Sequence, residues 1–170
     1  MNKSSAISAP FSSSSRIGLF QEMEAEFDKK NEGYFAKLLD HPDSIVRTRA
    51  VCILAEIAGE NAIDPISNVL INDKNALVRH EAAFSLGQLG FTKGIKALSE
   101  AMKKDTSLFV RHEAAIALGV IGSEDARAML TDALSDKSSE VRESAETALA
   151  NLDYIKAMKR KNRFTKLTGG

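Results

Sequence analysis

The chain has 170 residues, of which 44% are hydrophobic and 27% are charged, and its 23 basic residues balance its 23 acidic ones. A net charge of zero argues against binding to nucleic acid or to anionic membranes by bulk attraction, and the length suits one domain with a core. The single cysteine, Cys52, excludes an internal disulfide framework and favours a cytoplasmic protein. No apolar run approaches the roughly 18 residues that a membrane-spanning helix requires.

The first sixteen residues differ from the rest of the chain. They include seven serines, one proline and no acidic residue. Such a segment cannot bury enough apolar surface to order itself, so residues 1–16 are predicted to be a disordered tail. A Ser-rich, acid-poor start is also typical of organelle transit segments, which makes an organelle the alternative location. In residues 17–32, Ile17, Phe20 and Phe27 predict an amphipathic capping helix.

Residues 33–153 contain a sequence motif that occurs four times. A Val-Arg pair recurs at spacings of 32, 32 and 31 residues, and its valines are Val46, Val78, Val110 and Val141. Apolar residues follow each valine after four, eight and eleven positions, which places them on one face of a helix. The residue nine positions after each valine is always small, as close contact between helices requires. These small residues are Ala55, Gly87, Gly119 and Ala150.

Each of these helices has start and stop signals. Three residues before each valine stands a good N-cap residue, namely Asp43, Asn75, Ser107 and Ser138. Gly59, Gly90 and Gly122 end the first three helices. A shorter apolar pattern before each valine predicts a partner helix, and no stretch has the pattern of a strand. The sequence therefore predicts an all-α, right-handed α-solenoid of about four helix-turn-helix repeats.

The arginine after each valine is predicted to be structural. These arginines are Arg47, Arg79, Arg111 and Arg142. The residue five positions before the valine is Asp73, Asp105 and Asp136 in the last three units and His41 in the first. Because the guanidinium fork binds carboxylates and turn carbonyls well, we expect a ladder of Arg–Asp contacts along the stack, with His41 as a turn residue.

The motif V-R-x-x-A-x-x-x-L-[GA]-x-[IL] resembles the HEAT-like repeats of the phycobilisome-lyase type. The resemblance covers about 120 residues, those numbered 33–153. It implies the solenoid fold, but this fold hosts scaffolds, chaperones, lyases and an oxygenase.

Only the two central units carry a His-Glu pair two and three residues after the valine. The four residues are His80, Glu81, His112 and Glu113. Helix axes in a stack lie roughly 8–10 Å apart, so two imidazoles and a carboxylate from neighbouring helices can meet at one ion. Two histidines and one carboxylate form the ligand set of non-haem iron oxygenases. The alternative is that the pairs are solvated surface residues that reflect duplication alone.

The repeated VRHEAA stretch, followed by Leu-Gly, is similar to the deoxyhypusine hydroxylase family, whose members hold a di-iron centre with two such tandem pairs in each half. The resemblance implies a metal site of His80, Glu81, His112 and Glu113, with iron as the cofactor and an oxidoreductase of the hydroxylase kind. This chain matches one half only. A homodimer that brings four His-Glu pairs together is the corresponding hypothesis.

Two other functions remain open from the sequence. One is a non-catalytic scaffold whose partner is a protein or peptide, and the other is a bilin-lyase-like chaperone. Residues 154–170 form a basic tail, since Lys156 to Lys166 include six basic residues and no acid. This tail predicts either a solvated end or a docking segment for an acidic partner or a phosphate backbone. Cys52 is interpreted as filler.

Overall fold

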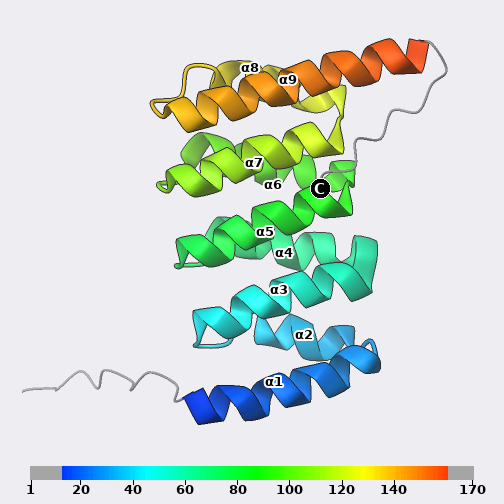
Figure 1. The fold of residues 1–170 in the computed structure, drawn as a ribbon, viewed down its shortest axis with the longest axis vertical. Helices are drawn as coiled ribbons and strands as arrows, with labels where there is room; N and C mark the ends of the chain where they lie inside the picture. The colour runs from blue at the N-terminus through cyan, green and yellow to red at the C-terminus, as the bar shows by residue number, and fades with distance from the viewer. Residues whose placement is uncertain (1–12, 161–170) are drawn as a thin grey trace, which may run out of the picture.

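The computed structural model describes residues 13–160, and helices are the regular elements of that range. The front layer in Figure 1 holds α1 (Ser13–Asp28), α3 (Ser44–Ala58), α5 (Ala76–Leu89), α7 (Leu108–Ile121) and α9 (Ser139–Arg160). The layer behind holds α2 (Glu32–Leu38), α4 (Ile63–Asn72), α6 (Ile95–Lys104) and α8 (Arg127–Ala133). Three short 3₁₀ turns, η1 (Gly59–Ala62), η2 (Thr92–Gly94) and η3 (Glu124–Ala126), connect the layers. The predicted all-α solenoid is confirmed.

The ends of the chain are described only in part. Helix α1 begins at Ser13, inside the segment assigned to the tail, and residues 1–12 lie outside the described range. Helix α9 continues past residue 153 to Arg160, while residues 161–170 of the basic tail lie outside that range as well. No helix in the described part of the chain combines the length and apolar character needed to cross a lipid bilayer.

The motif positions form the core between the two layers. All four motif valines are fully buried, and so are the leucines and alanines that follow them on the same helix face. From the back layer, Ile66, Leu70 and Leu98 pack into the same cluster. Met23 of α1 is also fully buried, so α1 covers the first repeat as the predicted capping helix would.

Glycine sets the distance between the front helices. A Cβ added to Gly87 would lie 2.8 Å from the Cβ of Ala117, and one added to Gly119 would lie 2.7 Å from that of Ala148. Real carbon atoms do not approach so closely, so only glycine lets α5 reach α7 and α7 reach α9 at this spacing. The predicted steric role of these glycines is confirmed.

The helix ends follow the predicted signals with one exception. The side chains of Asp43 and Asn75 accept hydrogen bonds from the N–H groups two residues later, and helices α5 and α7 end at Gly90 and Gly122 with φ of 72° and 67°. Ser107 occupies the N-cap position of α7, but its hydroxyl makes no capping bond. Asp105 Oδ1 instead accepts from the N–H of Ser107 at 2.8 Å, so the ladder aspartate takes over this role.

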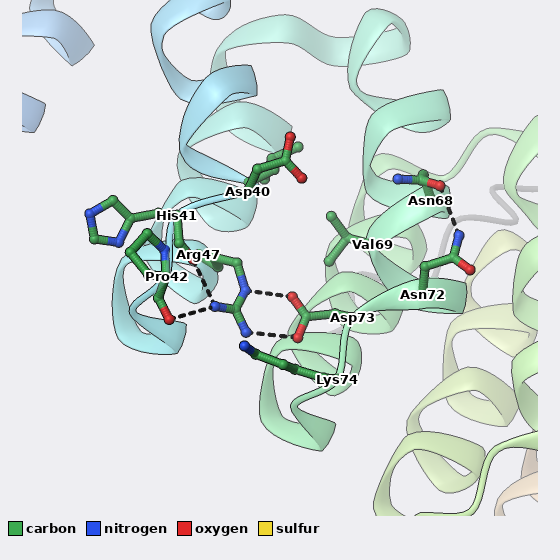
Figure 2. A pocket seen from close by; sticks show the side chains of 10 residues that line it. Asp40, His41, Pro42, Arg47, Asn68, Val69, Asn72, Asp73 and Lys74 are labelled. Atoms are coloured by element: carbon green, nitrogen blue, oxygen red, sulfur yellow. Dashed lines mark hydrogen bonds and ion pairs between the residues drawn. The ribbon is translucent and has the colours of Figure 1, made fainter. Parts of the chain in front are cut away.

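The Arg–Asp ladder runs along one edge of the stack. Arg47 donates from Nε to Asp73 Oδ2 at 2.6 Å and from Nη2 to Oδ1 at 2.9 Å, and Nη1 binds the carbonyl of His41 (Figure 2). The same fork joins Arg79 to Asp105 and Arg111 to Asp136. Each arginine therefore ties its own turn to the aspartate of the following repeat, as predicted.

These contacts fix the charge of the aspartates. Burial alone would raise the pKa of Asp73, but the hydrogen bonds from Arg47 and a backbone N–H hold this pKa below its usual value. The pKa of Asp105 is lowered in the same way against the same opposing burial. For Asp136, the Arg111 fork is the largest influence and lowers the pKa.

The two ends of the ladder differ from its middle. At the C-terminal end, Arg142 keeps the bond from Nη1 to its own turn carbonyl, that of Asp136, and its side chain is exposed. At the N-terminal end, Arg16 of α1 binds Asp43. The sequence analysis missed this first rung because Arg16 stands in a serine-rich segment without the motif valine. His41 is a turn residue as expected, and its Nδ1 accepts from the N–H of Asp43 at 3.1 Å.

Candidate functional site

The two His-Glu pairs lie near the start of α5 and α7, in the front layer of Figure 1. Successive residues of a helix point about 100° apart, so the two members of a pair diverge. The histidine turns toward the following helix and the glutamate toward the preceding one. Because α5 and α7 are adjacent in the stack, His80 of the first meets Glu113 of the second.

His80 and Glu113 form the central contact of the site. His80 Nε2 lies 3.4 Å from Glu113 Oε2, and the glutamate side chain is 12% exposed while the imidazole is 34% exposed. Burial raises the pKa of Glu113. The nearby His80 and His112 oppose this rise, and Glu81 adds to it. All three other residues of the predicted set therefore act electrostatically on this one carboxylate.

His112 has a neutral partner in α9. Ser144 Oγ lies 2.6 Å from His112 Nδ1 and 2.7 Å from the carbonyl of Glu140. A carbonyl only accepts, so the single hydroxyl proton of Ser144 points to Glu140, and the hydroxyl oxygen accepts from Nδ1–H of His112. This arrangement places the ring proton on Nδ1 and leaves the lone pair of neutral His112 on Nε2, the nitrogen through which a metal would be bound.

Glu81 has its partner in α3. Cys52 donates from Sγ to Glu81 Oε1 at 2.9 Å. Desolvation of the sulfur and the adjacent carboxylate raise the pKa of the Cys52 thiol to about 12, so the thiol stays protonated at neutral pH. Cys52 is thus more than filler, because it occupies the carboxylate that lacks a histidine in the preceding repeat.

The site therefore forms a diagonal row across four helices, which we call the His-Glu row: Cys52–Glu81, His80–Glu113 and His112–Ser144. The two outer partners were missed from sequence. Ser144 does stand where Glu113 stands in the preceding unit, three residues after the motif valine, and that alignment is the one signal that pointed to it.

Two clefts lie near these elements. One of about 350 Å³ lies between α3 and α5 and adjoins the His-Glu row through Cys52 and Glu81, with Phe84 and Leu89 as apolar lining. The other, of about 260 Å³, lies at the turn edge shown in Figure 2. Arg47 and Asp73, which line it, already bind each other, so we assign the second cleft to the ladder.

The donor types of the row suit a divalent transition metal, since two imidazoles and a desolvated carboxylate lie together. Within residues 13–160, however, no three His, Cys, Asp or Glu side chains already stand as a ready-made metal cluster. The donors fit an iron ion in chemistry, and the structure brings two of them, His80 and Glu113, into direct contact.

A model for HEAT repeats matches residues 63–150, which is more than half of the chain. The chain belongs to the HEAT repeat family. Its repeats resemble those in the solved structure of human deoxyhypusine hydroxylase in complex with glycerol, with 27% sequence identity and a TM-score of 0.69. That match covers 88% of this chain and 51% of the human one, so these HEAT repeats span about half of the longer chain. No curated protein matches the sequence.

Proposed function

We propose that this HEAT repeat protein binds non-haem iron as a relative of deoxyhypusine hydroxylase, with His80, His112 and Glu113 as ligands. The contact between His80 and Glu113 carries the proposal, because it pairs a histidine of one repeat with a buried carboxylate of the next. The 27% identity with the hydroxylase supports it. Iron held by two histidines and one carboxylate keeps open positions at which oxygen and substrate can react.

Each residue of the row has its own part in this proposal. Glu113 supplies negative charge from a buried position, where a cation is favoured. Ser144 holds the Nδ1 proton of His112, which keeps Nε2 available. Glu81, anchored by Cys52, adds negative charge next to Glu113 and orients the site from outside the ligand set. A dimer would bring a second set of these residues to the site, as the half-length match favours.

A metal titration tests the proposal. Anaerobic addition of Fe(II) to the purified protein, or of Co(II) with its absorption spectrum as the readout, is expected to show binding. The double variant His80→Ala/His112→Ala is expected to lose this binding with little change in melting temperature, since both imidazoles are partly exposed. His41→Ala is the matched control, because it removes the third histidine, far from the row, and is expected to bind as the wild type does.

The contrary results are equally clear. If the wild type binds neither ion and contains no iron after growth in iron-supplemented medium, the metal proposal is wrong. If the double variant unfolds, the histidines are structural. Either result favours the second candidate, a protein-binding scaffold. Exposed apolar side chains on the front layer, such as Leu77 and Phe109, are the specific observation in favour of that candidate.

A further inference from the structure

Large apolar side chains are exposed on the same face as the His-Glu row. Leu77 of α5 is 63% exposed and Phe109 of α7 is 66% exposed. Three further members of this group, Ile45 of α3, Phe84 of α5 and Ile116 of α7, are between a third and a half exposed. An exposed apolar patch of this kind marks a contact surface more often than a solvated one.

These side chains form two strips with the row between them. The first strip consists of Ile45, Leu77 and Phe109, each one residue before a motif valine, and the second consists of Phe84 and Ile116, each six residues after it. Seven residues of helix separate the strips by about 10 Å. The His-Glu pairs, two and three residues after the valine, lie between them.

The strips end where the His-Glu pairs end. In α9, the equivalent positions hold Glu140 and Thr147, and the equivalents of the pair are Glu143 and Ser144. Two repeats therefore carry both strips and a His-Glu pair, while the last repeat carries none of these features. This coincidence links the apolar surface to the row rather than to the fold in general.

The pattern of apolar, charged and apolar side chains is complementary to itself. Two copies that pack face to face are related by a two-fold axis in the plane of contact. An axis parallel to the helices places each strip on its own equivalent, and an axis perpendicular to them places one strip on the other. In both cases apolar side chains meet apolar ones, and the two rows face each other.

The charges of the row set a condition on this contact. Two facing rows bring together Glu81 and Glu113 from both copies, and like charges at close range cost several kcal/mol by the usual magnitude for interfaces. A divalent cation between the rows removes that cost. Binding of the metal and association of the copies then strengthen each other, because linkage of two binding equilibria is reciprocal.

We propose that the two strips and the row form the surface through which two copies of this chain associate around metal ions. The half-length match to a longer chain of similar fold agrees with this, because a second copy supplies the missing length. The metal dependence of the association rests on the proposed function, whereas the apolar contact itself does not.

Sedimentation velocity from about 1 to 100 µM protein, with and without Co(II), tests the surface, and Co(II) absorption in the same samples reports metal binding. We expect the wild type to form a dimer that Co(II) strengthens. Leu77→Glu/Phe109→Glu is expected to weaken association at least tenfold, since central apolar anchors carry much of the energy of an interface. Ile71→Glu, at a 39% exposed position on α4 in the other layer, is the matched control and is expected to dimerise normally.

The outcomes separate the two proposals. A wild type that binds Co(II) but stays monomeric at every concentration overturns the surface and leaves the metal site standing. A dimer that survives Leu77→Glu/Phe109→Glu but is broken by Ile71→Glu also overturns the surface. A metal-free dimer that the double variant breaks, with no Co(II) bound at any concentration, supports the apolar contact and contradicts the proposed function. Circular dichroism of both variants checks that they fold.

Discussion

The ladder and the His-Glu row both run across the stack, yet they are built differently. In the ladder, the same Arg–Asp contact occurs three times with nearly the same geometry. In the row, the His–Glu contact occurs once, and the neighbouring contacts use Cys52 and Ser144. A contact that every repeat needs for stacking recurs in every repeat, while a contact found once, at the centre, serves something other than stacking. Variants that separate these two roles are described next, from the largest expected effect to the smallest.

Arg47→Ala is expected to lower the free energy of unfolding by about 3–5 kcal/mol, because it leaves the carboxylate of Asp73 buried without its partner. Both side chains are about 5% exposed, so water cannot take over the role of the guanidinium. Urea unfolding followed by circular dichroism measures the loss. Arg142→Ala is the control: this arginine is exposed and binds one carbonyl, so its removal should cost a small fraction of that amount. Equal losses would mean that the ladder does not stabilise the stack.

Gly119→Ala tests the spacing that brings the rows together. The new methyl group would meet the Cβ and the backbone of Ala148, and overpacking of this kind costs about 1–3 kcal/mol. Gly18→Ala in α1 is the matched control, since it meets nothing within 4 Å and should gain up to about 1 kcal/mol from helix propensity. Thermal unfolding of both variants gives opposite signs if the close approach is real.

The pH dependence of stability distinguishes the two sets of carboxylates. The pKa values of Asp73, Asp105 and Asp136 lie below the ordinary 3.8 in the folded chain, so their stabilising effect is complete above about pH 4 and is lost as the pH falls further. The pKa of Glu113 lies above the ordinary 4.5, so ionisation of this group removes stability as the pH rises past that value. Urea midpoints between pH 3 and 7 measure both trends. Asp105→Asn should reduce the acid-side loss, and Glu113→Gln should abolish the opposing trend.

Ser144→Ala is expected to have the smallest effect on stability and a selective effect on the row. Without the hydroxyl, the Nδ1 proton of His112 loses its acceptor, and loss of such a partner weakens metal binding by about 10–100-fold. The ¹⁵N chemical shifts of His112 report its tautomer directly, even without metal. An unchanged tautomer and unchanged Co(II) affinity in the variant would contradict the role assigned to Ser144. Thr147→Ala, an exposed change on the same helix, is the control.

The sequence was sufficient for the features that repeat along the chain. The helices, the close glycines and the Arg–Asp ladder each follow from one position compared across four units, so every unit supports the others. The row was harder to predict, because the contact between His80 and Glu113 depends on how far one helix is shifted along its neighbour. That shift arises from packing between repeats, and no single repeat encodes it. The rung from Arg16 to Asp43 was missed because α1 lacks the motif.

The direction of the ladder bears on how the chain is made. Each ladder arginine precedes its aspartate by 25 or 26 residues, so a repeat that has left the ribosome still lacks its strongest contact until the next turn emerges. The nascent solenoid thus always ends in one solvated guanidinium, and each new turn secures the repeat before it. Synthesis from the N-terminus then assembles the stack in order, with every step locking in the one already completed.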